Sequence, residues 1–200
     1  MKTTKAEKEK LKGRIIEKAI PYFKENGNSG SGINSLMKQA GVTTGALYSN
    51  FGSKDDLLAE AICSELEKLE SEIFMIFKRE RKKALKFMIE TYFDLLNYQA
   101  SGDGCIYTAL GTDMHRSRAS DRARYEEYTK RIYQLFADAI HEQFPDQTPE
   151  ACYEKALVIY SGFVGAMTMA RIMKNQDIAH KILETEKRFM LETFVAPENC

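Results

Sequence analysis

The chain has 200 residues, of which 44% are hydrophobic, and it carries 29 basic and 29 acidic side chains. This length is enough for one large or two small domains with ordinary cores, which argues against intrinsic disorder. No run of 18 apolar residues occurs, and the first residues, MKTTKAEKEKLKGR, lack the apolar core of a secretory signal. We therefore expect a cytoplasmic protein that does not bind a membrane. Abundant Ala, Leu, Ile, Met, Glu and Lys with four Pro and no Trp favour long helices over a sandwich or barrel.

The net charge of zero hides an asymmetry along the chain. Residues 1–54 carry a net charge of +6, and the remainder carries −6. A basic first segment suggests a polyanionic partner for that segment, although such a difference is also common among proteins that bind nothing charged. The four cysteines are too widely spaced for a zinc-binding CxxC pair and too few for a disulfide framework. We expect reduced thiols and no metal site.

A first helix is predicted from about Lys5 to Asn26, where apolar residues recur at steps of three and four. Gly27 should end it, because glycine adopts the left-handed conformation of a helix stop. Pro21 conflicts with this pattern, since proline removes a backbone donor and crowds the preceding turn. The sequence leaves open whether Pro21 kinks this helix or ends it early.

Two short helices should follow. Ser31 can cap the second helix, which Gly41 closes. Thr43 and Thr44 begin the third, which Gly52 ends.

A long fourth helix should begin after Ser53, because Asp56 follows three residues later in the pattern of a capping box. About 26 residues from Lys54 would form a rod of roughly 40 Å, which is longer than a small domain is wide. We expect this helix to join two domains.

Five further helices complete an all-α fold of about nine helices. Their predicted spans are 85–96, 105–115, 120–144, 148–174 and the stretch after Asp177. Ser120 and Thr148 are expected caps, and Pro149 suits the first position of the eighth helix.

The turn between the second and third helices carries the functional signal. Gly41 tolerates the positive φ that a tight turn between short helices requires. Small residues at the start of the next helix let its backbone approach base edges in a major groove. Thr43, Thr44 and Gly45 meet that requirement. These features are typical of a DNA-binding helix-turn-helix, although any small helical bundle can contain such a turn.

The run LMKQAGVTTGALYSNFGSKDDLL at residues 36–58 resembles the N-terminal domain of the tetracycline-repressor-like (TetR/AcrR) transcription regulators. The matching residues are Ala40, Gly41, Val42, Thr43, Gly45, Leu47, Tyr48, Phe51, Ser53, Lys54 and Leu57. The resemblance implies a helix-turn-helix DNA-binding domain in residues 1–53 and a helical ligand-binding and dimerisation domain in residues 54–200. The later part is similar in its layout of helices rather than in a strict motif.

The resemblance also implies a set of DNA contacts. Its members are Ser31, Thr43, Thr44, Gly45, Tyr48, Asn50 and Lys54. Thr43, Thr44 and Gly45 would form the tip of the recognition helix in the major groove, and Tyr48 and Lys54 would bind phosphates, as a phenol and an ammonium near helix amides can. Ser31 would cap the second helix and touch a phosphate. Asn50 departs from the His or Tyr that the family usually has there.

An effector pocket is predicted between residues 85 and 175, which are rich in Tyr and Met. Such side chains can line a pocket for a flat or aliphatic ligand, but they can equally form a core. The favoured pocket residues are Tyr92, Tyr107, Met114, Tyr128 and Met167.

Cys105 begins a short helix after Gly104, where helix amides would favour the reactive thiolate. The pattern around it resembles a Gly-Cys element common in one branch of the family, which in some members senses oxidants or electrophiles. The alternative is a small buried residue with no chemical role.

A homodimer is predicted from the last two helices, which should form a four-helix bundle with those of a second copy. Small residues on the eighth helix would let a partner helix approach closely. They are Ser161, Gly162, Gly165, Ala166 and Ala170. These residues could instead serve packing within one chain.

The sequence contains no P-loop, GxSxG, HExxH or Rossmann motif, so we expect neither an enzyme nor a cofactor. The favoured function is a ligand-responsive repressor, released from palindromic operator DNA by a small molecule. One alternative is a thiol-based regulator of the same fold that senses through Cys105. Another is a helical interaction protein without DNA binding, which would leave the match at residues 36–58 unexplained.

Overall fold

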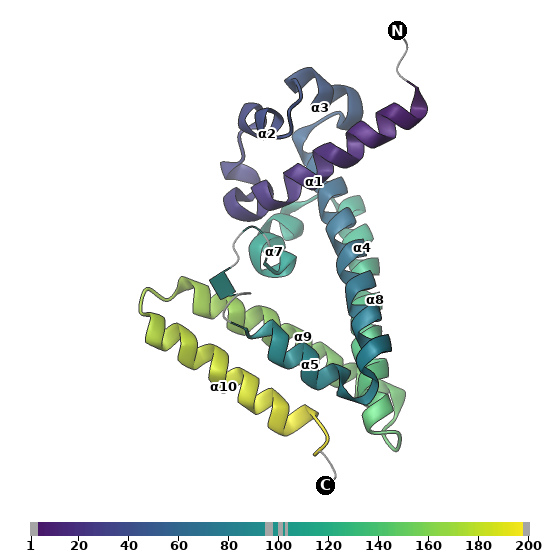
Figure 1. Cartoon of the computed structure of the whole chain (residues 1–200), viewed down its shortest axis with the longest axis vertical. Coiled ribbons are helices and arrows are strands. Elements are labelled where there is room, and N and C mark those ends of the chain that lie inside the picture. The colour runs from purple at the N-terminus through teal and green to yellow at the C-terminus, as the bar shows by residue number, and fades with distance from the viewer. Residues whose placement is uncertain (1–3, 95–97, 100–101, 103, 198–200) are drawn as a thin grey trace. The chain divides into compact units, whose positions relative to one another are not determined.

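The computed structural model describes residues 4–94, 98–99, 102 and 104–197, and over these residues the chain is all helical, without a β-strand (Figure 1). The α-helices are α1 (Lys5–Gly30), α2 (Ile33–Gln39), α3 (Thr44–Phe51), α4 (Lys54–Glu80), α5 (Ala84–Tyr92), α7 (Ile106–Arg116), α8 (Ala119–Gln143), α9 (Pro149–Ile172) and α10 (Gln176–Phe194). A single 3-10 turn, Arg81–Lys83, precedes α5. None of the helices described is long and apolar enough to span a bilayer. The all-α expectation is confirmed.

Contacts divide the chain into two compact units. The first comprises Met1–Glu67 and Ser101–Glu126, and the second comprises Lys68–Ala100 and Glu127–Cys200. Helices α4 and α8 contribute residues to both units. The expected division of function between residues 1–53 and 54–200 stays a prediction.

Helix α1 runs past Pro21 and is interrupted only at Gly27, where φ is 65° and ψ is 174°. Of the two outcomes that the sequence left open at Pro21, an early end of the helix does not occur. The carbonyl that Pro21 leaves unbonded belongs to Glu17, which is exposed and open to hydration. Gly27 breaks the helix as expected, but one more helical turn follows and ends at Gly30.

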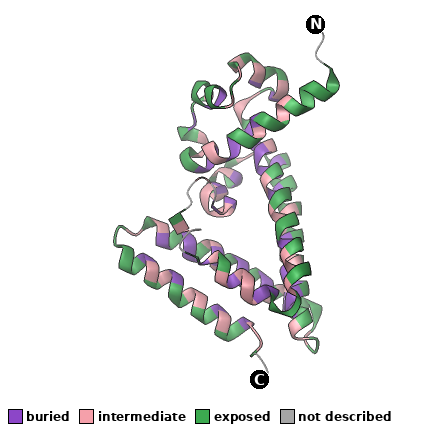
Figure 2. Ribbon diagram, in the orientation of Figure 1, coloured by how far each residue is buried: buried purple, intermediate pink, exposed green. Residues whose placement is uncertain are grey.

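Side chains from the helices of the first unit meet in its core. Figure 2 shows the buried faces of these helices turned toward one another. The fully buried members include Ile15 and Phe23 of α1, Leu36 of α2, Leu47 of α3 and Ile62 of α4. Leu47 and Phe51, which both match the family motif, are buried in this core.

In the second unit, α10 packs alongside α9 (Figure 1). Aromatic rings contact one another in its core. Phe136 of α8 makes edge contacts with Phe77, Tyr160 and Phe163, at ring-centroid distances of 5.1, 5.5 and 5.9 Å. Tyr92 stacks on Phe163 with ring centroids 4.3 Å apart. Much of the aromatic content of this unit therefore forms its core.

Two expected helix caps, Ser31 and Ser120, are wrong, and two are confirmed. One of these is Ser53, whose Oγ accepts from the Asp56 amide at 3.0 Å at the start of α4. The N-cap residue of α2 is Gly32 rather than Ser31, and no side chain forms a capping hydrogen bond there. Ser31 instead ends α1, and its hydroxyl donates to the Gly27 carbonyl oxygen. Helix α8 begins at Ala119, so Ser120 lies within it. Thr148 caps α9, where its Oγ1 accepts from the amide of Ala151 at 3.2 Å.

Other predicted boundaries agree with the structure within a few residues. Gly52 ends α3 with a φ of 84°, and α4 extends for 27 residues from Lys54. Helix α5 ends at Tyr92, and the remainder of the predicted 85–96 helix falls partly outside the described residues.

Candidate nucleic-acid interface

A tight turn holds α2 and α3 in a fixed relationship. Gly41 has a φ of 66°, a conformation that residues with a Cβ rarely adopt. The amide of Val42 donates to the Met37 carbonyl oxygen at 3.0 Å, and the amide of Gly41 donates to the Lys38 carbonyl oxygen at 3.1 Å. Because Leu36 and Leu47 are fully buried, the hydrophobic sides of α2 and α3 face the core. Tyr48 on α3 is exposed.

The first two turns of α3 present a small, open surface. Thr43 and Gly45 are exposed, and a Cβ added to Gly45 would meet nothing closer than Thr43 Oγ1 at 3.8 Å. Tyr48 is 55% exposed, which is unusual for an aromatic side chain on a short helix with a buried face. This geometry permits a close backbone approach to base edges, with a phenol beside it to reach a phosphate.

Thr44 is held by a residue that the sequence did not point to. Its hydroxyl donates to Oδ1 of Asn34, an exposed residue of α2, at 3.0 Å. This bond orients the Thr44 hydroxyl so that its lone pairs are the groups left for a partner. Asn34 was missed because its role depends on the angle between α2 and α3, which no local pattern encodes.

Lys54, predicted to bind a phosphate, lies at the start of α4 and is engaged within the first unit. Its ammonium donates to the carbonyl oxygens of Asn28 at 2.6 Å and Ser31 at 3.1 Å. These carbonyls belong to the end of α1, where a helix leaves acceptors without intrahelical partners. Lys54 therefore ties the end of α1 to the start of α4.

Asn50 and Ser31 are also turned inward. Asn50 Nδ2 donates to the Ala46 carbonyl of its own helix at 2.7 Å. Ser31 is buried and its hydroxyl is bonded to the Gly27 carbonyl. Contacts of these two side chains with DNA stay predictions, as do those of Thr43, Thr44, Gly45, Tyr48 and Lys54.

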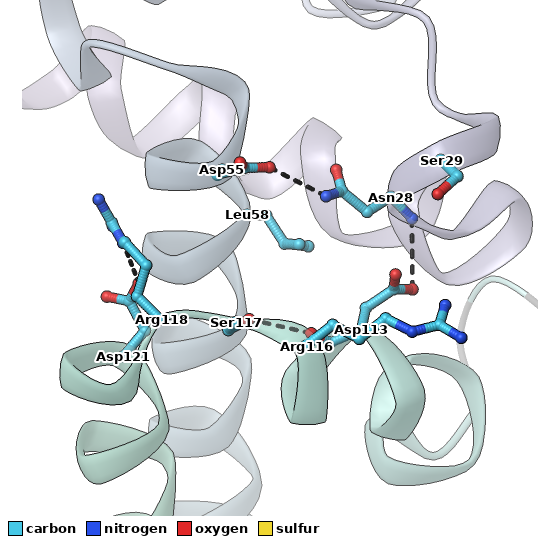
Figure 3. A pocket seen from close by; sticks show the side chains of 9 residues that line it. All are labelled: Asn28, Ser29, Asp55, Leu58, Asp113, Arg116, Ser117, Arg118 and Asp121. Carbon is cyan, nitrogen blue, oxygen red and sulfur yellow. Dashed lines mark hydrogen bonds and ion pairs between the residues drawn. The ribbon is translucent and has the colours of Figure 1, made fainter.

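A polar cavity of about 150 Å³ lies in the first unit between α1, α4, α7 and the start of α8 (Figure 3). Asn28 lies between two carboxylates there: its Nδ2 donates to Asp55 Oδ1 at 2.9 Å, and its backbone amide donates to Asp113 Oδ2 at 3.3 Å. Arg118 pairs with Asp56 and Asp121, each at 2.7 Å. The charged wall of this cavity differs from the Tyr- and Met-lined pocket expected from the sequence.

The predicted effector residues are distributed over both units. Cys105, Tyr107 and Met114 belong to the first unit, where Cys105 directly precedes α7 and is half-buried. Tyr92, Tyr128 and Met167 belong to the second. Met167 is fully buried, and the Arg131 guanidinium lies 4.5 Å from the centre of the Tyr128 ring. Their role in binding a ligand stays a prediction.

A metal site finds no support in the part of the chain that the structure describes, which holds no suitable group of three His, Cys, Asp or Glu side chains.

Known proteins show similarity to both the motif and the fold. Residues 15–61 match the family model described as bacterial regulatory proteins, tetR family. The fatty acid metabolism regulator protein of Bacillus subtilis is 29% identical over 121 residues, which cover 58% of this chain and 59% of that protein. The chain thus matches less than two thirds of the length of this relative.

Two solved structures share the fold at low sequence identity. The reduced form of Escherichia coli NemR superposes with a TM-score of 0.79 at 15% identity, over 95% of this chain and 100% of that one. The regulator FadR from B. subtilis in complex with stearoyl-CoA superposes with a TM-score of 0.62 at 19% identity, over 87% of this chain and 96% of that one. Together with the helix-turn-helix geometry, the family match identifies residues 15–61 as similar to bacterial regulatory proteins of the tetR family. Beyond that segment, the two superpositions show a shared fold.

Proposed function

We propose that this chain is a homodimeric repressor that binds a two-fold-related operator and is released from it by a small molecule. The observation that carries the proposal is the surface of α3, where Thr43, Gly45 and Tyr48 are exposed beside a buried Leu47. Two such surfaces on one dimer would read half-sites one or more helical turns apart.

An exposed apolar surface on α9 and α10 supports the homodimer. Its members are Leu157, Val158, Met169, Ile172, Ile178 and Phe189. Gly165 lies in this region with open space around the position of a Cβ. Exposed apolar side chains gathered on two adjacent helices are typical of a protein–protein interface.

Not all of the small residues on α9 are available to a partner chain. A Cβ on Gly162 would collide with Met190 and Glu186 of α10 in the same chain, and Ala166 and Ala170 are buried within it. The sequence left open whether these small residues serve a dimer interface or packing within one chain, and the two alternatives apply to different positions along the helix. Gly162, Ala166 and Ala170 serve packing within the chain, while Ser161 and Gly165 stay free for the proposed dimer.

Release from DNA would act through α4 and α7. Helix α4 contributes to both units, and its first residue, Lys54, holds the end of α1 by two hydrogen bonds. Helix α7 packs on α1 and follows Cys105 directly. A ligand that shifts either helix would change the position of α3 relative to its half-site, and linkage requires that ligand and DNA weaken each other equally.

Fatty-acyl compounds are the first effector class to test. One relative is named a regulator of fatty acid metabolism, and one protein of similar fold was solved with stearoyl-CoA. A long apolar ligand would suit Met and Tyr side chains such as Met167 and Tyr92, which adapt to aliphatic groups.

The test has two stages. The purified chain is first used to select binding sites from a random duplex library, and selection of a palindrome is the expected result. Stearoyl-CoA, dyes, drugs and aldehydes are then screened by thermal shift, and each hit is tested for release of the selected duplex. Failure to enrich any sequence would refute the repressor proposal, and hits that bind without weakening DNA binding would refute the coupling.

A thiol-based mechanism is the second candidate, and the position of Cys105 favours it. Burial raises the pKa of the Cys63 thiol, and Cys152 is also buried, whereas Cys105 is half-buried at the start of α7. Cys105→Ser separates the two mechanisms. Noncovalent effectors should still release DNA from this variant, whereas electrophiles should lose their effect if Cys105 is the sensor.

A further inference from the structure

The N-terminal part of α1 is a charged helix that takes no part in the core. Ile15 is the first buried residue of α1, so ten helical residues, Lys5 to Arg14, precede it. They correspond to about 15 Å of helix. Figures 1 and 2 show this segment as an exposed extension at the N-terminal end of α1. We call residues 5–14 the basic extension.

A complete capping box begins this extension. Thr4 Oγ1 accepts from the Glu7 amide at 3.2 Å, and the Glu7 carboxylate accepts from the Thr4 amide at 2.7 Å. The Thr4 amide, and then the Thr4 hydroxyl at 2.9 Å, donate to the Glu7 carboxylate and lower its pKa. Without tertiary packing, short helices are marginal in water, and a reciprocal cap offsets part of that cost. The cap therefore favours a preformed helix outside the core.

The charge of the extension is positive and largely unneutralised. It contains five Lys or Arg and two Glu. Lys12 pairs with Glu60 at 3.5 Å, but none of Lys5, Lys8, Lys10 and Arg14 forms an ion pair with an acid in the residues that the structure describes. Free cations along one rigid helix suit a polyanion rather than a single small anion.

Lys12 shows which face of the extension points toward the recognition helix. Its ammonium lies 5.6 Å from the ring centre of Phe51, the last residue of α3. Lys5 and Lys8 precede Lys12 by seven and four residues, so the three side chains share one face of α1. Lys10 and Arg14 project from the opposite face.

We propose that Lys5 and Lys8 bind the DNA backbone beside the half-site that α3 occupies. This inference rests on the proposed DNA-binding function and adds a contact surface outside the helix-turn-helix. B-DNA carries one negative charge per about 1.7 Å of axis, so a basic helix of about 15 Å beside it faces a dense row of phosphates. Such contacts add affinity and position without reading bases.

Two double variants of the full chain separate a specific phosphate contact from general attraction. Lys5→Gln/Lys8→Gln removes two charges from the proposed DNA face, and Lys10→Gln/Arg14→Gln removes two from the opposite face of the same segment. Binding to a random-sequence duplex and to the duplex selected by the wild-type chain is measured over a series of KCl concentrations between about 50 and 200 mM. Circular dichroism checks that both variants retain the wild-type helix content.

The proposal predicts an unequal effect of the two variants. The plot of log K against log salt has a negative slope. In Lys5→Gln/Lys8→Gln, the magnitude of this slope should fall by about 0.9 for each phosphate that the variant no longer neutralises. The fall should be clearly smaller in Lys10→Gln/Arg14→Gln. An equal fall in both would mean general attraction, and no fall would mean a solvated helix, so either result would overturn the proposed contact. Binding to the random-sequence duplex tests the proposed contact even if the chain selects no operator. Failure to select an operator would refute the proposed function but not this contact.

Discussion

Asp113 of α7 accepts a hydrogen bond from the backbone amide of Asn28, 3.3 Å away, one residue beyond the break in α1 at Gly27. The break deprives this part of α1 of regular helical hydrogen bonds, and the carboxylate supplies an acceptor from another helix. Gly27 has a φ of 65°, and a Cβ there would lie 3.5 Å from the same Asp113 oxygen. A helix of the first unit thus holds the end of α1 through its backbone.

Replacing Asp113 with Ala should lower the free energy of unfolding by about 1 kcal/mol, because the Asn28 amide loses its acceptor. Asp113→Asn keeps an acceptor oxygen and should cost less. Urea unfolding followed by circular dichroism measures both. Equal stability of the Ala variant and the wild type would show that the contact does not stabilise the native state.

The ion pair between Lys24 and Glu65 should be more costly to break. The Lys24 side chain is 2% exposed and that of Glu65 is 20% exposed. Lys24→Ala leaves a largely buried carboxylate without its cation, so we expect a loss of stability of about 3 kcal/mol, the lower end of the range for breaking a buried ion pair. The double variant Lys24→Met/Glu65→Leu should recover most of that loss in urea unfolding. A double variant as unstable as Lys24→Ala would contradict this explanation.

Asp56 should contribute to acid sensitivity. The Ser53 hydroxyl, 2.6 Å away, and then Arg118, 2.7 Å away, lower the pKa of its carboxyl in the folded chain. Below about pH 4 the unfolded chain therefore binds the proton first. The stabilisation is complete above that pH and is lost as the pH falls through the lower folded pKa.

The variants Asp56→Asn and Ser53→Ala check this pH dependence. Both should flatten the dependence of unfolding free energy on pH between about pH 4 and pH 2. Urea titrations at a series of pH values provide the measurement. A wild-type slope retained in Asp56→Asn would assign the acid sensitivity to other carboxyl groups.

Asn34 should influence base preference although it lies on α2. Asn34→Ala frees the Thr44 hydroxyl from its 3.0 Å bond, so that this hydroxyl can turn toward a different base group. We expect Asn34→Ala and Thr44→Ala each to change the ranking of operator variants. Tyr48→Phe should instead weaken all of them alike, since a phosphate contact carries no sequence information. Competition binding with single-base operator variants is the measurement, and an unchanged ranking in Thr44→Ala would exclude direct readout by Thr44.

Ile172→Glu should disrupt the proposed dimer without unfolding the monomer. Ile172 is 64% exposed in the single chain, so a carboxylate there is costly only when a partner covers it. Light scattering at micromolar concentration should give a dimer for the wild type and a monomer for Ile172→Glu. Lys174→Glu, at an exposed polar position nearby, serves as the control and should stay dimeric. A monomeric wild type would refute the homodimer.

Local chemistry explains why much of the helix layout was predictable. Gly41 and Gly52 end helices because each takes a positive φ, and Thr148 starts one because its hydroxyl accepts from a free amide. The helix-turn-helix motif was equally visible, since its glycine and small polar residues are neighbours in sequence. These signals depend on backbone conformation within a few residues, which the sequence by itself determines.

Partners distant in sequence were decided only by the tertiary structure. Lys54 bonds carbonyls of residues 28 and 31, and Thr44 bonds Asn34 on another helix. Gly162 packs within the chain while Gly165, one turn along the same helix, stays open. A periodic pattern shows that a residue lies on a given face but not which helix covers that face, because the covering helix is chosen by packing across the whole unit.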